Sequence, residues 1–193
     1  RHVDIALYDC MVSMHDYAVQ CYTMSGGKEI PKRSGHDLPQ STVYGVFAGR
    51  DGYFVIAAQV DDAWKRLAGL IGGAELAGDP RFHDPAGRNA HREEILPKVR
   101  AWAMAQPSVA ACLAALDAVR VPCAKVQRID EVLADPQIIA RGMIVEQEHP
   151  VLGRIRMPNL PFRVSECDTS PKSVAPLLGQ HNREIAAKLG YPA

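Results

Sequence analysis

Histidine and aspartate stand next to each other at three places in this sequence, and this pairing could do chemistry. The pairs are His15-Asp16, His36-Asp37 and His83-Asp84. Imidazole and carboxylate groups together are good ligands for divalent metals, as in metal-dependent phosphohydrolases. Such sites draw further His and Asp from neighbouring helices of a mostly helical fold, whereas this chain alternates predicted helices with strands. The pattern therefore favours no metal site, and only His36 remains a candidate at the edge of an active site.

Most of the other reactive residue types are better explained by structure. Asp4 and Asp9 lie where a strand leads into a helix, and an acid near a helix N-terminus is stabilised by ~0.3–1 kcal/mol. Cys123 follows a proline in an apolar stretch, which is typical of an inert core thiol. Three arginines could bind phosphate, although a solvated helix face is the default explanation; they are Arg88, Arg92 and Arg100.

The overall composition excludes several classes of function. With 47% apolar residues, the 193-residue chain can bury a core. Its 22 basic and 22 acidic residues balance, so nothing predicts binding to nucleic acid or to a membrane surface. No stretch approaches the ~18 apolar residues of a membrane-spanning helix. The five cysteines contain no Cys-x-x-Cys pair, which favours a reducing cytoplasm; they are Cys10, Cys21, Cys112, Cys123 and Cys167.

Apolar periodicity predicts the elements at the start of the chain. A helical stripe from Leu7 to Met24 predicts one helix that ends before Gly26-Gly27. Residues 28–41 contain two prolines and little periodicity, which is typical of an extended linker. The β-prone stretches 43–47 and 53–58 flank an Asp-Gly pair and predict a hairpin.

Helices dominate the stretch after this hairpin. Asp61 or Asp62 is expected to cap the first of them. Two more are predicted over 89–105 and 107–119, and Pro97 is expected to kink or break the earlier one. A short strand over 121–126, a strand pair over 143–147 and 154–157, and a short final helix complete the pattern.

A set of short motifs runs along almost the whole chain. The motifs are Val3-Asp-Ile-Ala-Leu-Tyr-Asp9, Tyr44-Gly-Val-Phe47 with Asp51-Gly52, Trp64 with Leu67 and Gly72, Asp79-Pro-Arg-Phe82 with Arg88 and Arg92, Val121-Pro-Cys-Ala124, Asp135-Pro-Gln137, His149-Pro150 with Gly153, and Ala175-Pro-Leu-Leu-Gly179. No single motif is specific. In this order and at this spacing, the set resembles the C-terminal half of a family III CoA-transferase, whose relatives include formyl-CoA and carnitine CoA-transferases and α-methylacyl-CoA racemase.

The resemblance implies an α/β fold in which a large Rossmann-like domain is built from both chain ends. A small mixed α/β domain, residues 43–157 here, is inserted between them. Residues 1–42 would then be a part of the large domain with its linker. Residues 158–193 would be the return linker and the C-terminal helix of the same split Rossmann-like domain.

The resemblance also implies the chemistry, which is transfer of coenzyme A between an acyl-CoA thioester and a carboxylic acid. In such enzymes an aspartate attacks the thioester and forms a mixed anhydride, then an aspartyl-CoA thioester that the acceptor resolves. This nucleophile is expected upstream of Arg1, in a missing N-terminal half, because the chain opens as if cut. No catalytic residue, metal or tightly bound cofactor is assigned within these residues. The chain alone is expected to be inactive. With the missing half, it is expected to form an interlocked homodimer or a heteromer.

Two residues are candidates for contact with the substrate or CoA. Tyr8 lies near the CoA site of relatives, although a packing role is the alternative, and His36 lies in the linker. The stretch from Arg33 to Gln40 has one glycine where formyl-CoA transferases carry a glycine-rich loop, which argues against oxalate or formate as substrate. Two other functions stay open. One is an α-methylacyl-CoA racemase, with its acid and base upstream, and the other is a noncatalytic accessory module.

Overall fold

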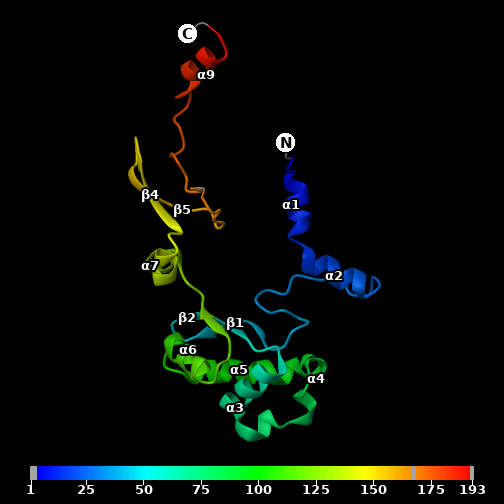
Figure 1. Ribbon diagram of the computed structural model, residues 1–193. Coiled ribbons are helices and arrows are strands. Elements are labelled where there is room, and N and C mark those ends of the chain that lie inside the picture. Colours follow the sequence, from blue (N-terminus) through cyan, green and yellow to red (C-terminus); the bar gives the residue numbers. More distant parts are fainter. Residues whose placement is uncertain (1–3, 167, 192–193) are drawn as a thin grey trace. The chain divides into compact units, whose positions relative to one another are not determined.

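The computed structural model describes residues 4–166 and 168–191, so Val3 of the first motif and Cys167 lie outside the described residues. The chain divides into two compact units, Arg1–Val126 and Gln127–Ala193. Both units mix helices with antiparallel strands, so the fold class is mixed α/β, as predicted (Figure 1). The division of the chain at residues 42 and 157 stays a prediction.

A three-stranded antiparallel sheet organises the first unit. Its strands are β1 (Tyr44–Gly49), β2 (Gly52–Ala57) and β3 (Cys123–Lys125), in the order β1-β2-β3. The register of the first two strands runs from Tyr44 opposite Ala57 to Gly49 opposite Gly52. The predicted hairpin is therefore confirmed, and its turn falls at Arg50-Asp51.

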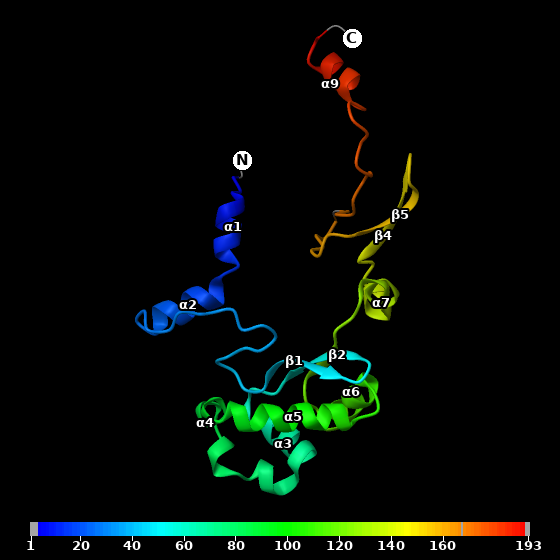
Figure 2. The same ribbon diagram turned by 180° about the vertical axis from the view of Figure 1, so that it is seen from behind.

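Helices cover one face of this sheet (Figures 1 and 2). They are α3 (Asp61–Ala77), a 3-10 turn η1 (Pro80–Phe82), α4 (Pro85–Ala90), α5 (Arg92–Ala105) and α6 (Val109–Ala118). The largest apolar side chains buried between these layers are Trp64, Phe54, Phe82, Ile56, Leu67, Ile95 and Leu116. Every described residue that is buried lies between Thr42 and Val121, so this layered segment holds the core of the described chain.

The helical segment at the start of the chain differs from its prediction. Two helices, α1 (Leu7–Ser13) and α2 (Asp16–Met24), replace the single predicted helix. Neither buries a residue, so no packing holds the two together as one straight helix. Their apolar side chains are exposed instead, at 87% for Leu7 and 83% for Met24.

Two local predictions within the helices are wrong. Helix α5 continues through Pro97, because the buried side chains of Ile95, Leu96 and Val99 hold it against the core while Pro97 faces outward. Val60, and not an aspartate, occupies the N-cap of α3. Asp61 lies one position further on, where its carboxylate meets a buried arginine described below.

The second unit contains α7 (Ile129–Ala134), α8 (Pro136–Ala140), β4 (Ile144–His149), β5 (Gly153–Pro158) and α9 (Asn182–Lys188). Strands β4 and β5 pair antiparallel, with Ile144 opposite Pro158, which confirms the predicted strand pair. None of the described residues of this unit is buried. The unit therefore lacks an apolar core of its own within the described residues.

No single helix in the described part of the chain is long and apolar enough to cross a membrane, although α5 and α6 together meet that length and composition across a bend of 116°.

Candidate functional site

The two predicted site residues lie in different surroundings. Tyr8 is in the first turn of α1 and is 76% exposed. His36 is exposed in the linker, where it lines a cavity of about 540 Å³ with residues 34–37 and 46–48, Tyr53, Arg100 and Met104. The structure therefore places His36 in a hollow between the linker, the hairpin and α5. Tyr8 is not among the residues that line this hollow.

Backbone contacts fix the position of His36 on the sheet. Its carbonyl oxygen accepts a hydrogen bond from the Val46 amide at 3.2 Å, and Asp37 forms an isolated bridge with Gly45. A Cβ atom at position 45 would lie 2.9 Å from the His36 carbonyl oxygen. Gly45 thus permits the close approach of the linker to β1.

The carboxylate of Asp37 joins the linker to α5. Arg100 Nη2 lies 3.4 Å from Asp37 Oδ2, and Arg92 Nη2 lies 3.6 Å from the same oxygen. Arg92 Nη1 also donates to the carbonyl oxygen of Pro39 at 3.1 Å. Arg92 Nε also lies 3.8 Å from Glu93 Oε1, so two carboxylates balance the two guanidinium charges. Of these two arginines, Arg100 lines the cavity and Arg92 does not.

Asn89 holds the end of the linker from the last turn of α4. Its Oδ1 accepts from the Thr42 amide at 2.8 Å, and its Nδ2 donates to the Gln40 carbonyl at 2.6 Å. An amide side chain that pairs with two backbone groups replaces the strand pairing that this segment lacks. The linker is therefore ordered against the core from His36 to Thr42.

The contacts that Asp37 and Asn89 make with the linker and the helices were not predicted from the sequence. Nor was the pairing of Arg92 and Arg100 with Asp37. Arg92 and Arg100 are eight residues apart, which is about two helical turns and puts them on one face of α5. That spacing was the available signal. Nothing in the sequence shows that the linker returns to this face, because the contact joins residues 63 positions apart.

Arg88 is neither a phosphate ligand nor part of a solvated helix face. Its side chain is fully buried, and its Nη2 donates to the Gln59 carbonyl at 2.7 Å and pairs with Asp61 Oδ1 at 2.8 Å. Its Nη1 donates to the Phe82 carbonyl at 3.1 Å. The guanidinium also lies 5.9 Å from the ring centre of Trp64. A buried charge with three oxygen partners cross-links the start of α3 to η1 and α4 and has a structural role.

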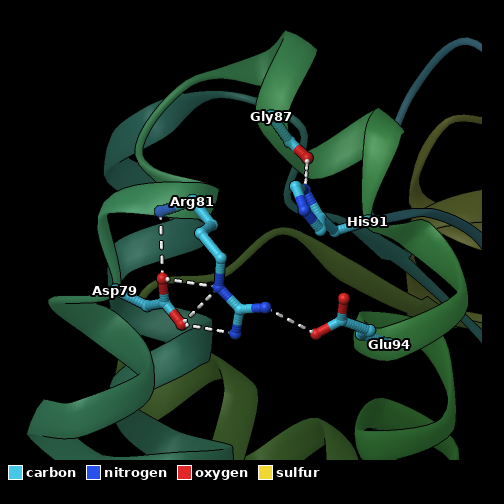
Figure 3. A network of polar contacts seen from close by, with 5 residues as sticks. All are labelled: Asp79, Arg81, Gly87, His91 and Glu94. Atoms are coloured by element: carbon cyan, nitrogen blue, oxygen red, sulfur yellow. Dashed lines mark hydrogen bonds and ion pairs between the residues drawn. The ribbon is translucent and has the colours of Figure 1, made fainter.

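Asp79, Arg81 and Glu94 form a second polar network, shown in Figure 3. Asp79 Oδ1 accepts from the Arg81 amide at 2.9 Å, and Arg81 Nη1 lies 3.0 Å from Glu94 Oε2. Beside it, His91 Nδ1 lies 2.9 Å from the Gly87 carbonyl oxygen. Hydrogen bonds from the Arg81 side chain and amide lower the pKa of Asp79 below its ordinary value. These groups are paired with one another, so the network fixes η1 against α5.

The remaining reactive groups do not assemble into a site. His83 Nδ1 lies 3.6 Å from Asp84, whose carboxylate caps α4 through the Gly87 amide at 2.7 Å. Burial, followed by the contact with Asp117, raises the pKa of the Cys123 thiol to about 11, as suits an inert thiol. Within residues 4–166 and 168–191, no group of three or more His, Cys, Asp or Glu side chains could hold a metal ion.

Comparison with known proteins gives one consistent answer. The model of CoA-transferase family III matches residues 1–182. The chain is 34% identical over 188 residues to a succinyl-CoA–D-citramalate CoA-transferase of Chloroflexus aurantiacus, covering 97% of this chain and 46% of that protein. It is 33% identical over 191 residues to a succinyl-CoA:mesaconate CoA-transferase of Haloarcula marismortui, covering 98% of this chain and 47% of that protein.

A solved structure agrees with these relatives. A CAIB/BAIF family protein from Brucella suis superimposes with a TM-score of 0.73 at 32% identity, covering 98% of this chain and 48% of that one. The chain thus spans about half the length of the relatives that it matches. On the strength of the match over residues 1–182 and of these identities, the chain belongs to CoA-transferase family III.

Proposed function

We propose that this chain forms part of an enzyme that transfers coenzyme A from an acyl-CoA thioester to a carboxylic acid. The observation that carries the proposal is the family match over residues 1–182. The nucleophile is an aspartate outside these 193 residues, and it forms the aspartyl anhydride described above. The two relatives reported are CoA-transferases, so transfer is proposed in preference to racemisation.

The names of these relatives suggest the substrate class. Both carry succinyl-CoA in their names, with D-citramalate in one and mesaconate in the other. We propose succinyl-CoA as the CoA donor and a branched dicarboxylate as the acceptor. The single glycine between Arg33 and Gln40 agrees with this choice over oxalate or formate.

The exposed helices support the proposal that the chain needs further polypeptide. Helices α1, α2 and α9 bury no residue within the described chain. Exposed apolar side chains include Leu7, Met14 and Met24 at one end and Leu178 and Leu189 at the other. Apolar surface of this extent marks a face that is covered by other protein. We propose that the missing N-terminal half of a Rossmann-like domain covers it, in an interlocked dimer.

His36 and Arg100 supply the part of the substrate site that this chain contributes. His36 lines the cavity and is held there by the hydrogen bond from the Val46 amide to its carbonyl oxygen, and Arg100 lines the same cavity. In the proposed reaction Arg100 attracts the free carboxylate of the acyl group or acceptor. Tyr8 is proposed to lie near CoA once α1 is covered.

The test uses the polypeptide encoded by the gene that contains this chain. It is incubated with succinyl-CoA and isotope-labelled D-citramalate, mesaconate or oxalate, and thioesters are separated by chromatography. Label is expected in the thioester fraction for the two branched acids. A racemase would instead exchange the α-proton with deuterated water without moving label between acids, and an accessory module would do neither. Either result would overturn the proposal.

A further inference from the structure

An open groove between α3 and the end of α6 has a one-sided charge. The cavity measures about 670 Å³ and is lined by Lys65, Arg66, Gly69 and Leu70 on α3 and by residues 118–120 beyond it. All of its ionisable lining residues are cations, namely Lys65, Arg66 and Arg120. A concave wall with three positive charges and no negative one concentrates anions at its surface.

None of these cations forms an ion pair with a residue that the structure describes. Arg66 Nη2 donates to the carbonyl oxygen of Arg120 at 3.1 Å, which ties the two walls of the groove together. The side chains of Lys65 and Arg120 are exposed and form no ion pair with any residue that the structure describes. Their hydrogen-bond donors are therefore free to meet a ligand.

Arg120 holds a backbone conformation that favours glycine. Its amide donates to the Asp117 carbonyl at 2.9 Å, and the Val121 amide donates to the Leu116 carbonyl at 3.0 Å, which together close a Schellman motif after α6. In this motif residue 120 adopts φ 56°, the left-handed region in which glycine is preferred. An arginine here lowers stability relative to glycine, and its side chain gives no packing in return because it is exposed.

Gly69 is the second locally unfavourable choice in the same groove. It lies in the interior of α3, where glycine is less favourable than alanine. A Cβ atom at this position would meet nothing within 4 Å, so packing does not require the glycine. Gly69 and the half-buried Leu70 are apolar lining residues of the groove. Where two residues work against local stability and meet at one surface, a function at that surface is the expected reason.

We infer that this groove binds a small phosphorylated ligand of the nucleoside-phosphate class. Three cations suit a multiply charged anion, and the planar guanidinium groups of Arg66 and Arg120 match phosphate oxygens in pairs. The apolar lining at Gly69 and Leu70 is proposed to contact the base. The volume lies within the range of ~300–1,000 Å³ that is usual for small-molecule sites. This inference does not rest on the proposed CoA transfer.

Calorimetric titration of the full chain with ATP tests the inference. Binding is expected at submillimolar concentration and should weaken steeply as salt is raised. Arg120→Gly is expected to weaken ATP binding at least tenfold while it leaves the melting temperature unchanged or raises it. Lys65→Gln should weaken binding severalfold. A matched control is Lys98→Gln on α5, an exposed lysine outside the groove, for which affinity should stay within twofold.

Three results would overturn the inference. The first is no binding of ATP, and the second is equal affinity in Arg120→Gly, Lys65→Gln and the unaltered chain. The third is equally tight binding of succinate or of a glutamate-rich peptide, because either would show that any anion satisfies the groove. The titration contains no CoA, so its failure and a failure of the transfer assay are separate outcomes.

Discussion

At the scale of single residues, Arg88 shows how one buried charge organises the core. Its guanidinium donates to the backbone carbonyls of Gln59 and Phe82 and pairs with the carboxylate of Asp61. A cation this deep is tolerated because both of its terminal nitrogens are paired, although its Nε is buried without a hydrogen-bond partner. The family resemblance includes this arginine, and the structure gives it a physical reason.

Arg88→Ala is expected to lower the free energy of unfolding by about 2–4 kcal/mol, since two buried carbonyls lose their donor and a cavity opens beside Trp64. Urea unfolding followed by tryptophan fluorescence measures the change. Lys98→Ala on α5 is the control and should change the same free energy by less than about 0.5 kcal/mol. A loss of that smaller size for Arg88→Ala would show that the buried contacts contribute nothing net.

The Cys123 thiol gives a prediction on pH. Its pKa of about 11, against an ordinary 9.0, leaves about a hundredfold less thiolate at pH 8. Alkylation by iodoacetamide should therefore be slow at pH 8 and should still rise about tenfold per pH unit up to pH 10. Peptide mass spectrometry measures the alkylation rate of Cys123, with exposed Cys10 and urea-unfolded protein as references. A rate at Cys123 that levels off near pH 9 would contradict this account.

At the scale of elements, α5 carries both the core and the contacts to the linker. Ile95, Val99 and Ala103 face the core, while Arg92 and Arg100 reach Asp37. Pro97 sits on the exposed side of this helix and lacks the amide that would bond to the carbonyl of residue 93. The helix persists because packing outweighs this local penalty.

Pro97→Ala is expected to raise the free energy of unfolding by about 1–3 kcal/mol, because alanine restores that hydrogen bond and the side chain at 97 packs against nothing buried. The same urea titration measures this change in the free energy of unfolding. Lys98→Ala, one position further along α5, again serves as the reference. A destabilised Pro97→Ala protein would mean that the proline fits a bend on which the Asp37 contacts depend.

Local patterns predicted the elements better than the contacts between them. The Asp-Gly turn and β-prone flanks predicted the β1-β2 hairpin, and the strand pair predicted over 143–147 and 154–157 is observed as β4 and β5, because both depend on neighbours in sequence. The single helix over 7–24 and the break at Pro97 were wrong, because tertiary packing was absent in one case and present in the other. The site followed the same rule. His36 stays a prediction as a site residue, whereas the contact of the neighbouring Asp37 with Arg100 joins residues 63 positions apart and was not predicted.

At the scale of the whole molecule, the distribution of burial is the main result. The described core lies between residues 42 and 121, whereas α1, α2, α9 and the hairpin of the second unit bury nothing. The chain spans about half of its relatives and leaves these apolar faces open, which supports the proposal that the other half covers them. The family match and the burial pattern thus support the same proposal independently.

The most direct test compares CoA transfer by this chain alone with transfer by the same chain joined to the upstream half of its enzyme. Succinyl-CoA and labelled D-citramalate are supplied to equal amounts of both proteins, and labelled thioester is measured over time. The account predicts turnover by the joined protein and none above the uncatalysed rate by the 193 residues. Turnover by the 193 residues alone would contradict it, because the nucleophile would then lie within this chain.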